Sequence, residues 1–178
     1  MENTSELAFK CDKFKVYKVK KLSSSGKPYV DWNIVYNDSV VILALTKENQ
    51  AVLIREHVGE SNKPVLQLPG GGSKENEGLE AAAKRELAEE TGFTGDAPVL
   101  LFKNSESTRK LEHDVYYFAV SNAKKSTVQK FDSDEMITDV VLIDFKELLS
   151  LSKNNRLETS GDAEAVLALA KRMTFSHP

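Results

Sequence analysis

The chain is 178 residues long, with 40% hydrophobic and 29% charged residues and a formal net charge of −3 at pH 7. This length predicts one domain, with room for a small appended sheet. The net negative charge argues against nucleic acid as a partner, because proteins that bind it offer a basic field to the phosphates. No apolar run approaches the roughly 18 residues that a membrane span requires.

The N-terminal region and the cysteine content favour a cytoplasmic protein. The first ten residues, MENTSELAFK, are acidic and lack the apolar core of a secretory signal peptide. Cys11 is the single cysteine, which excludes an internal disulfide. Its plainest interpretation is a strand residue without a redox role.

The first predicted elements are two strands joined by a turn. Residues 14–20 alternate apolar and polar side chains, as a half-buried strand does. The SSSGKP segment at residues 23–28 predicts a turn, and residues 29–36 predict a second strand that contains Trp32. This tryptophan is a candidate for stacking on a base or sugar of the substrate. A place in the core or in a dimer interface is the more common role for such a residue.

A hairpin follows these two strands. Residues 40–45 form a continuous apolar run that predicts a buried strand, and residues 50–55 predict the returning strand, which ends at Arg55. The forked guanidinium of Arg55 suits a phosphate or a carboxylate of a substrate. A surface ion pair with Glu56 or Glu60 is the alternative.

Residues 65–69 predict a short strand that leads into three consecutive glycines and then into a helix. Gly70, Gly71 and Gly72 allow the backbone to come close to phosphates or to metal ions. At the other end of the helix, Gly92 fits the left-handed position that terminates it.

The C-terminal part of this helix crowds carboxylates on one side. At 100° per residue, Glu86, Glu89 and Glu90 fall within an arc of roughly 100°. Like charges four residues apart repel by roughly a few tenths of a kcal/mol, and the helix dipole disfavours anions at this end. A divalent cation makes the arrangement favourable, and oxygen ligands at this density suit magnesium, manganese or calcium. A solvated acidic face is the alternative for a Glu-Glu pair taken alone.

The rest of the chain predicts further strands around that helix and two more helices. The strands are expected at residues 99–103, 115–120 and 140–144, and the helices at 145–151 and 162–173, the longer one with Ser160 or Gly161 near its N-cap. This order predicts an α/β/α sandwich, with a mixed sheet between the first and the last helix.

The run from Gly71 to Phe93 reads GGSKENEGLEAAAKRELAEETGF. It resembles the Nudix box, GX5EX7REUXEEXGU with U aliphatic or aromatic, and it matches every defined position. The resemblance extends more loosely from about residue 9 to about residue 170. It implies a hydrolase that cleaves a nucleoside diphosphate linked to another moiety, with Mg²⁺ or Mn²⁺ as its cofactor.

The resemblance also implies roles for residues of the box. Glu86 and Glu90 would be the main metal ligands, with Glu89 joining them or binding a bridging water. The carbonyl of Gly70 would be a further ligand. An ion pair between Glu77 and Arg85 would fix the loop before the helix, so the role of Glu77 would be structural first.

The order of elements resembles the branch of ADP-ribose and nucleoside diphosphate sugar pyrophosphatases. In that branch an N-terminal antiparallel sheet pairs with a second subunit, so the resemblance implies a homodimer. It divides the chain into a dimerising strand extension at residues 1–36 and a hydrolase domain at residues 37–178. Gln67 is a candidate substrate contact. It stands where the branch often has a glutamate two residues before the proline, and this departure leaves an inherited role for Gln67 open.

The resemblance places the general base on a loop before the last core strand. In this chain that loop contains Asp132, Asp134 and Glu135, and Glu135 is the expected base because it lies just before the apolar residues Met136 and Ile137. Asp132 and Asp134 are the alternatives, and each of the three is equally consistent with an ordinary turn acid.

The expected substrate is a nucleoside diphosphate sugar or ADP-ribose, split into a nucleoside monophosphate and a sugar phosphate. A nucleoside triphosphatase or an RNA 5′-end pyrophosphohydrolase of the same fold is one alternative. A non-catalytic nucleotide sensor is another, although such sensors tend to lose box carboxylates and this chain has them all.

Overall fold

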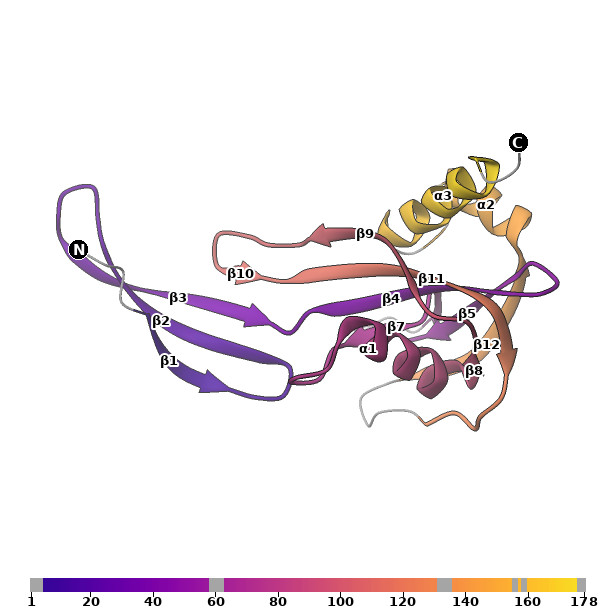
Figure 1. Ribbon diagram of the computed structural model, residues 1–178. Helices are drawn as coiled ribbons and strands as arrows, with labels where there is room; N and C mark the ends of the chain where they lie inside the picture. Colours follow the sequence, from indigo (N-terminus) through magenta and orange to yellow (C-terminus); the bar gives the residue numbers. More distant parts are fainter. Residues whose placement is uncertain (1–4, 58–62, 131–135, 155–156, 158–159, 176–178) are drawn as a thin grey trace.

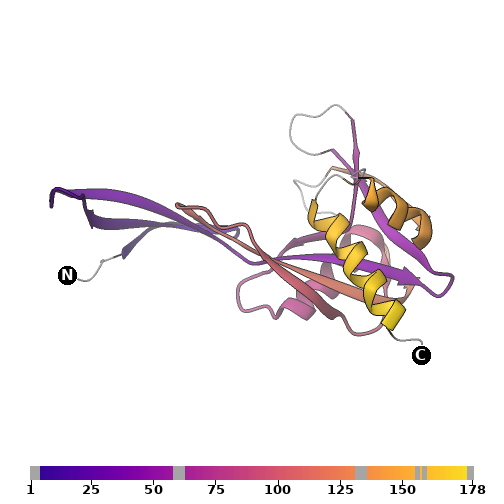
Figure 2. The ribbon, with the colours of Figure 1, turned by 90° about the horizontal axis from the view of Figure 1, so that it is seen from above.

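The computed structural model describes residues 5–57, 63–130, 136–154, 157 and 160–175. They form an elongated N-terminal sheet and a layered body with a central sheet (Figure 1). Viewed from above, the N-terminal sheet extends away from the body, together with the connection between β9 and β11 (Figure 2).

Twelve strands and three α-helices, with one π-helical turn, make up the described part of the chain. The strands are β1 (Ser5–Lys10), β2 (Phe14–Leu22), β3 (Pro28–Tyr36), β4 (Ser39–Thr46), β5 (Gln50–Glu56), β6 (Val65–Gln67), β7 (Gly70–Gly72), β8 (Phe93–Thr94), β9 (Val99–Ser105), β10 (Leu111–Glu112), β11 (Asp114–Lys125) and β12 (Ile137–Asp144). The helices are α1 (Leu79–Glu86), the π-helical turn η1 (Leu87–Thr91), α2 (Phe145–Lys153) and α3 (Ser160–Phe175). None of the described helices is long and apolar enough to cross a membrane.

The central sheet is mixed, as the sequence predicts. Its main path runs β12-β5-β4-β11-β8, while β6 pairs with β5, β7 with β4 and β9 with β11. The pairing of β4 with β11 is parallel and the other pairings in this sheet are antiparallel. Strand β4 lies in the middle and is buried, because its unbroken apolar run can pack on both faces.

One face of the central sheet packs against α1 and η1. Ala82, Ala83 and Leu87 from this helical segment pack against Val40 and Ile42 of β4. Each is almost completely shielded from solvent. Small alanines let the helix lie close to the sheet, which brings the carboxylates of the box near the strand ends.

The other face is covered by α2 and α3. Phe145 and Leu148 of α2 and Val166 of α3 pack with Leu43 and Leu53 of the sheet. Burying a leucine or phenylalanine side chain contributes about 1.5–3 kcal/mol. The two covered faces confirm the predicted α/β/α sandwich.

The N-terminal sheet, which we call the arm, has the strand order β1-β2-β3-β10. Its first three strands are antiparallel. Strands β2 and β3 are the two that the sequence predicts, whereas β1 was not predicted. The fourth strand differs from the expectation: β10 comes from residues 111–112 and pairs parallel to β3. The backbone amide of Ile34 also donates to the carbonyl of Lys110 at 2.8 Å. The arm therefore contains a segment from far beyond residue 36. A strand of two residues has no recognisable sequence pattern, so this segment was not predicted.

The box helix is not a regular α-helix to its end. After α1 the backbone widens into η1, which carries Glu89 and Glu90, and Gly92 then takes the left-handed conformation with φ of 73°. The hydroxyl of Thr91 donates to the carbonyl of Leu87 and accepts from the amide of Phe93. The 100° spacing assumed from the sequence therefore does not hold beyond Glu86. Single π-helical turns inside α-helices occur frequently at functional sites.

Candidate active site

Strand β7 runs between β4 and the box helix, with Gly70 against the backbone of β4 and Gly71 against Glu86 of the helix. A Cβ atom on Gly71 would lie 2.6–2.8 Å from the carboxylate atoms of Glu86, and one on Gly70 would collide with the carbonyl oxygen of Val40. At Gly70 the obstacle is fixed backbone, so a side chain is excluded there, whereas at Gly71 a side chain would displace the carboxylate of Glu86. The glycines therefore bring the backbone of this loop against the acidic face of the helix.

Two of the box carboxylates are buried under this loop. Glu86 is 5% exposed and Glu90 is 2% exposed. One oxygen of Glu90 accepts the backbone amide of Gly70 at 2.8 Å, and the carbonyl of Glu90 accepts the side-chain amide of Gln129. Ionised carboxylates are seldom buried unless they are paired or coordinate a metal.

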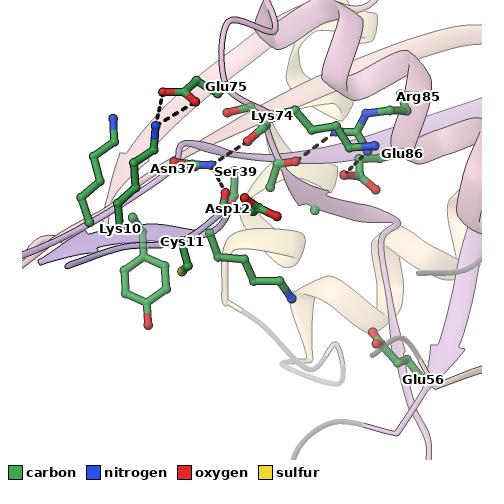
Figure 3. A pocket seen from close by; sticks show the side chains of 16 residues that line it. Lys10, Cys11, Asp12, Asn37, Ser39, Glu56, Lys74, Glu75, Arg85 and Glu86 are labelled. Atoms are coloured by element: carbon green, nitrogen blue, oxygen red, sulfur yellow. Dashed lines mark hydrogen bonds and ion pairs between the residues drawn. The ribbon is translucent and has the colours of Figure 1, made fainter. Parts of the chain in front are cut away.

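Arg85 holds this cluster together. Its guanidinium makes a two-pronged ion pair with Glu77, with both N···O distances at 2.8 Å. It also donates to Glu86 at 2.7 Å, to Glu89 at 2.9 Å and to the carbonyl of Gly72 at 3.0 Å. One arginine thus joins three carboxylates and the glycine loop, and Figure 3 shows it beside Glu86 at one end of the pocket.

The electrostatics of the Glu77–Arg85 pair show how strongly it is coupled. Hydrogen bonding to Arg85, together with the backbone amide of Lys74, lowers the pKa of Glu77 from 4.5 to about 2 despite some burial. The same pair, followed by Glu89 and Glu86, raises the pKa of Arg85 above its ordinary value. Glu77 is therefore charged at neutral pH and closes the loop onto the helix.

The donor set of this cluster has the chemistry that a hard divalent cation requires. It consists of the carboxylate oxygens of Glu86, Glu89 and Glu90 and of the nearby backbone of Gly70, a position that has no room for a side chain. Among the described residues, no three acidic, histidine or cysteine side chains already converge as a metal cage. The Arg85 ion pairs and the Gly70 amide engage the carboxylates instead.

A cavity of about 680 Å³ opens against this cluster. Arg85 and Glu86 line one part of it, and the turn between β1 and β2 forms another wall. That turn and its flanks contribute Lys10, Lys13 and Lys15. The cavity lining thus mixes these ammonium groups with carboxylates, which are those of Glu86, Asp12, Glu56 and Glu75.

The arm is tied to the box loop around this cavity. Lys10 forms an ion pair with both oxygens of Glu75, at 2.7 and 2.9 Å. The side-chain amide of Asn37 donates to the carbonyls of Asp12 and Ser73, at 2.7 and 3.1 Å. These contacts, drawn in Figure 3, place the β1–β2 turn beside the box of the same chain.

The predicted substrate residues lie elsewhere than the box. Arg55 is exposed near the end of β5 and is not among the residues that line the cavity, whereas its neighbour Glu56 is. Gln67 donates its side-chain amide to Glu56 at 2.5 Å. Trp32 is 48% exposed on the arm and also lies outside the cavity lining.

Strand alternation explains why Glu56 lines the cavity. Val52 packs with the core beneath α1, and side chains two residues apart point to the same face of a strand, so Glu56 shares the face of Val52. This two-residue alternation along residues 50–56 can be read from the sequence. The lysines around the β1–β2 turn had no comparable signal, because they approach the box only through the tertiary fold.

The expected base, Glu135, and its alternatives Asp132 and Asp134 lie outside the described residues. The chain on each side of them is anchored near the site. The amide of Lys130 donates to the carbonyl of Glu89 at 2.8 Å, and the carbonyl of Met136 accepts the amide of His57 at 3.2 Å.

The mixed sheet between two helical layers, with the glycine loop and the acidic helix against it, is the arrangement expected for the family that the box resembles. Residues 35–164 match the model of the NUDIX domain, which is well over half of the chain. The chain therefore belongs to the Nudix family, and it is a Nudix hydrolase.

Two relatives and one solved structure are similar to this chain. The chain is 26% identical over 140 residues to the methanol dehydrogenase activator of Bacillus methanolicus, covering 78% of this chain and 75% of that protein. It is 22% identical over 129 residues to the ADP-ribose pyrophosphatase of Bacillus subtilis (strain 168), covering 72% and 69%. A crystal structure of an ADP compounds hydrolase has the same fold, with a TM-score of 0.75, 19% identity and coverage of 99% of this chain and 97% of that one.

Proposed function

We propose that this Nudix hydrolase cleaves the pyrophosphate of a nucleoside diphosphate linked to another moiety, with Mg²⁺ or Mn²⁺ as cofactor. The observation that carries the proposal is the glycine loop over the buried carboxylates of Glu86 and Glu90, where Glu86 lines a cavity that also holds lysines. Carboxylates suit the cation, and ammonium groups suit the phosphates of the substrate.

The proposed roles follow from these contacts. Glu86, Glu89, Glu90 and the carbonyl of Gly70 would hold the cation, which supplies charge neutralisation at the diphosphate and activation of water for attack on phosphorus. Arg85 is held by its ion pair with Glu77, and it orients Glu86 and Glu89 through two further ion pairs.

The substrate class is supported by the order of elements and by the names of two similar proteins. One is an ADP-ribose pyrophosphatase and the other an ADP compounds hydrolase. ADP-ribose or a nucleoside diphosphate sugar is therefore the first choice. The products would be a nucleoside monophosphate and a sugar phosphate.

A substrate screen tests this proposal. Purified protein with Mg²⁺ is incubated with ADP-ribose, nucleoside diphosphate sugars, dinucleoside polyphosphates and nucleoside triphosphates, and phosphate released by an added phosphatase is measured. We expect turnover of ADP-ribose or a nucleoside diphosphate sugar. Binding of a nucleotide without turnover of any compound would instead establish a sensor.

The variant Glu90→Gln tests the metal assignment. We expect it to keep its fold and lose turnover on the order of 100-fold or more, because a neutral amide is a poor ligand for a hard cation. Glu80→Gln is the matched control, since Glu80 is exposed on the same helix. Near-native turnover in Glu90→Gln would show that the metal assignment is wrong.

The base is proposed to be Glu135, acting as a proton acceptor for the attacking water. Glu135→Gln is expected to lower kcat more than it changes KM, because a base acts in the chemical step. Parallel variants Asp132→Asn and Asp134→Asn provide the comparison. A larger fall in kcat for either of them would move the role to that residue.

A further inference from the structure

A buried carboxylate from the last helix reaches the loop that precedes the box. Asp162 lies in the first turn of α3 and is 3% exposed. One of its oxygens accepts the backbone amide of Leu68 at 3.1 Å, across 94 residues of sequence. The proposed chemistry assigns no role to Asp162, and a buried charge of this kind requires a compensating partner.

The amide of Leu68 belongs to a short segment held by two carboxylates. Pro69 has no amide hydrogen, and the next amide, that of Gly70, donates to Glu90 at 2.8 Å. The carbonyl of Pro69 accepts the amide of Ile42 at 2.8 Å. Each backbone amide of residues 68–70 is thus bound by an acid, one from α3 and one from the box helix.

The position of Asp162 depends on a close approach of α3 to the sheet. A Cβ atom on Gly161 would collide with the hydroxyl of Tyr117. The glycine at this position therefore lets the first turn of α3 lie directly against Tyr117 of β11. Burial, and next the charge of Asp162, raise the pKa of Tyr117 to about 12. Tyr117 is therefore neutral at physiological pH, and Asp162 is held in an interior where its hydrogen bond to Leu68 is well shielded from water.

We propose that Asp162 is a positioning residue that fixes residues 68–70, and with them the carbonyl of Gly70, for cation binding. This inference rests on the proposed function, because that function assigns the Gly70 carbonyl to the metal. Asp162 acts on the same segment as Glu90 but from the opposite layer of the sandwich. It links the far helix to the metal loop without touching the substrate.

The test measures Mn²⁺ binding by electron paramagnetic resonance, without substrate, in wild-type protein and in Asp162→Ala and Asp162→Asn. Loss of a partner outside the ligand shell typically weakens metal binding about 10–100-fold. We expect about a tenfold loss for Asp162→Ala. Asparagine keeps an acceptor but loses the charge, so we expect about a threefold loss for Asp162→Asn.

Glu164→Ala is the control on the same helix, because Glu164 is exposed. Hydrogen exchange of the Leu68 and Gly70 amides, read by NMR, should accelerate in both Asp162 variants and stay unchanged in this control. If Asp162→Ala does not fold, Asp162→Asn alone decides the matter. Unchanged Mn²⁺ affinity in the folded variants would overturn the inference, whereas failure of wild-type protein to bind Mn²⁺ would overturn the proposed function itself.

Discussion

At the residue scale, Arg85 connects the parts of the candidate site. Its guanidinium engages Glu77, Glu86, Glu89 and the carbonyl of Gly72 at distances of 2.7–3.0 Å. The fork geometry of arginine permits this, and a lysine ammonium in its place would lack the paired, planar donors. The box thus needs an arginine at this position for its shape as well as for its charge.

The pKa of Glu77 predicts a pH-dependent contribution to stability. This pKa is lowered from 4.5 to about 2 in the folded protein. The ion pair therefore stabilises the fold fully above about pH 4.5, and its contribution disappears as the pH falls from about 4.5 to about 2. We expect Glu77→Gln to lower the free energy of unfolding by about 1–3 kcal/mol at pH 7, with a smaller difference from wild type at pH 3.

Urea unfolding of both proteins between pH 3 and pH 7 provides the measurement. Glu75→Gln is the matched control, because the Lys10–Glu75 pair is exposed and surface pairs contribute about 0–1 kcal/mol. A difference between wild type and Glu77→Gln that stayed constant over this range would contradict the assigned pKa.

At the element scale, η1 and Gly92 shape the end of the box helix. The carbonyl of Gly92 accepts the amides of Ser126 and Thr127 at 2.9 and 3.1 Å. A Cβ atom on Gly92 would lie 2.7 Å from the carbonyl oxygen of Thr127. The segment that leads to the expected base loop is therefore packed against the glycine that ends the helix.

Alanine substitutions at Gly92 and Gly26 should separate the strain of a left-handed backbone from the clash of a side chain with its neighbours. Gly26 has a similar φ of 77°, but a Cβ atom on it would meet no other atom of the described residues within 4 Å. Gly26→Ala should therefore cost only the strain of a left-handed backbone, about 1–2 kcal/mol. Gly92→Ala should cost about 1 kcal/mol more, because the Thr127 segment must also shift. Thermal and urea unfolding measure both, and equal losses would show that the contact with Thr127 carries no energy.

The elements also show how far sequence reasoning reached. The buried β4, the hairpin to β5, the box helix and both later helices follow from apolar patterning, which is a local property. The π-helical turn was missed because the pattern of Leu87 and the carboxylates fits a regular helix equally well. The contact between Asp162 and Leu68 was out of reach, since only the tertiary fold joins two residues 94 positions apart.

At the scale of the whole molecule, the arm presents an apolar face. Cross-strand partners share a face of a sheet, and the pairings place one set of exposed apolar side chains together. The set consists of Phe9, Leu22, Val30, Trp32 and Tyr36. Lys18 and Lys20 lie on the same face, opposite Trp32 and Val30. Exposed apolar patches can mark interaction sites, so this face is where we place the contact of the predicted homodimer.

We expect a dimer of the 19.8 kDa chain in sedimentation velocity at micromolar concentration. Trp32→Glu should shift it to the monomer, because a charge buried in an apolar interface is strongly unfavourable. Val128→Glu is the control, since Val128 is 85% exposed and lies outside the arm. A wild-type monomer, or a Trp32→Glu dimer of unchanged affinity, would count against an interface on this face.

The parallel pairing of β4 with β11 affects the order in which the parts of the site fold. Ser39 pairs with Val115, so the two strands enclose the entire box between them in sequence. Pairings between distant segments close large loops and slow folding. During synthesis the box emerges before β11 and α3, whose contacts fix the glycine loop and the helix end. Refolding protein should therefore regain helical signal early and enzymatic activity only in its slowest phase, when the last helix docks.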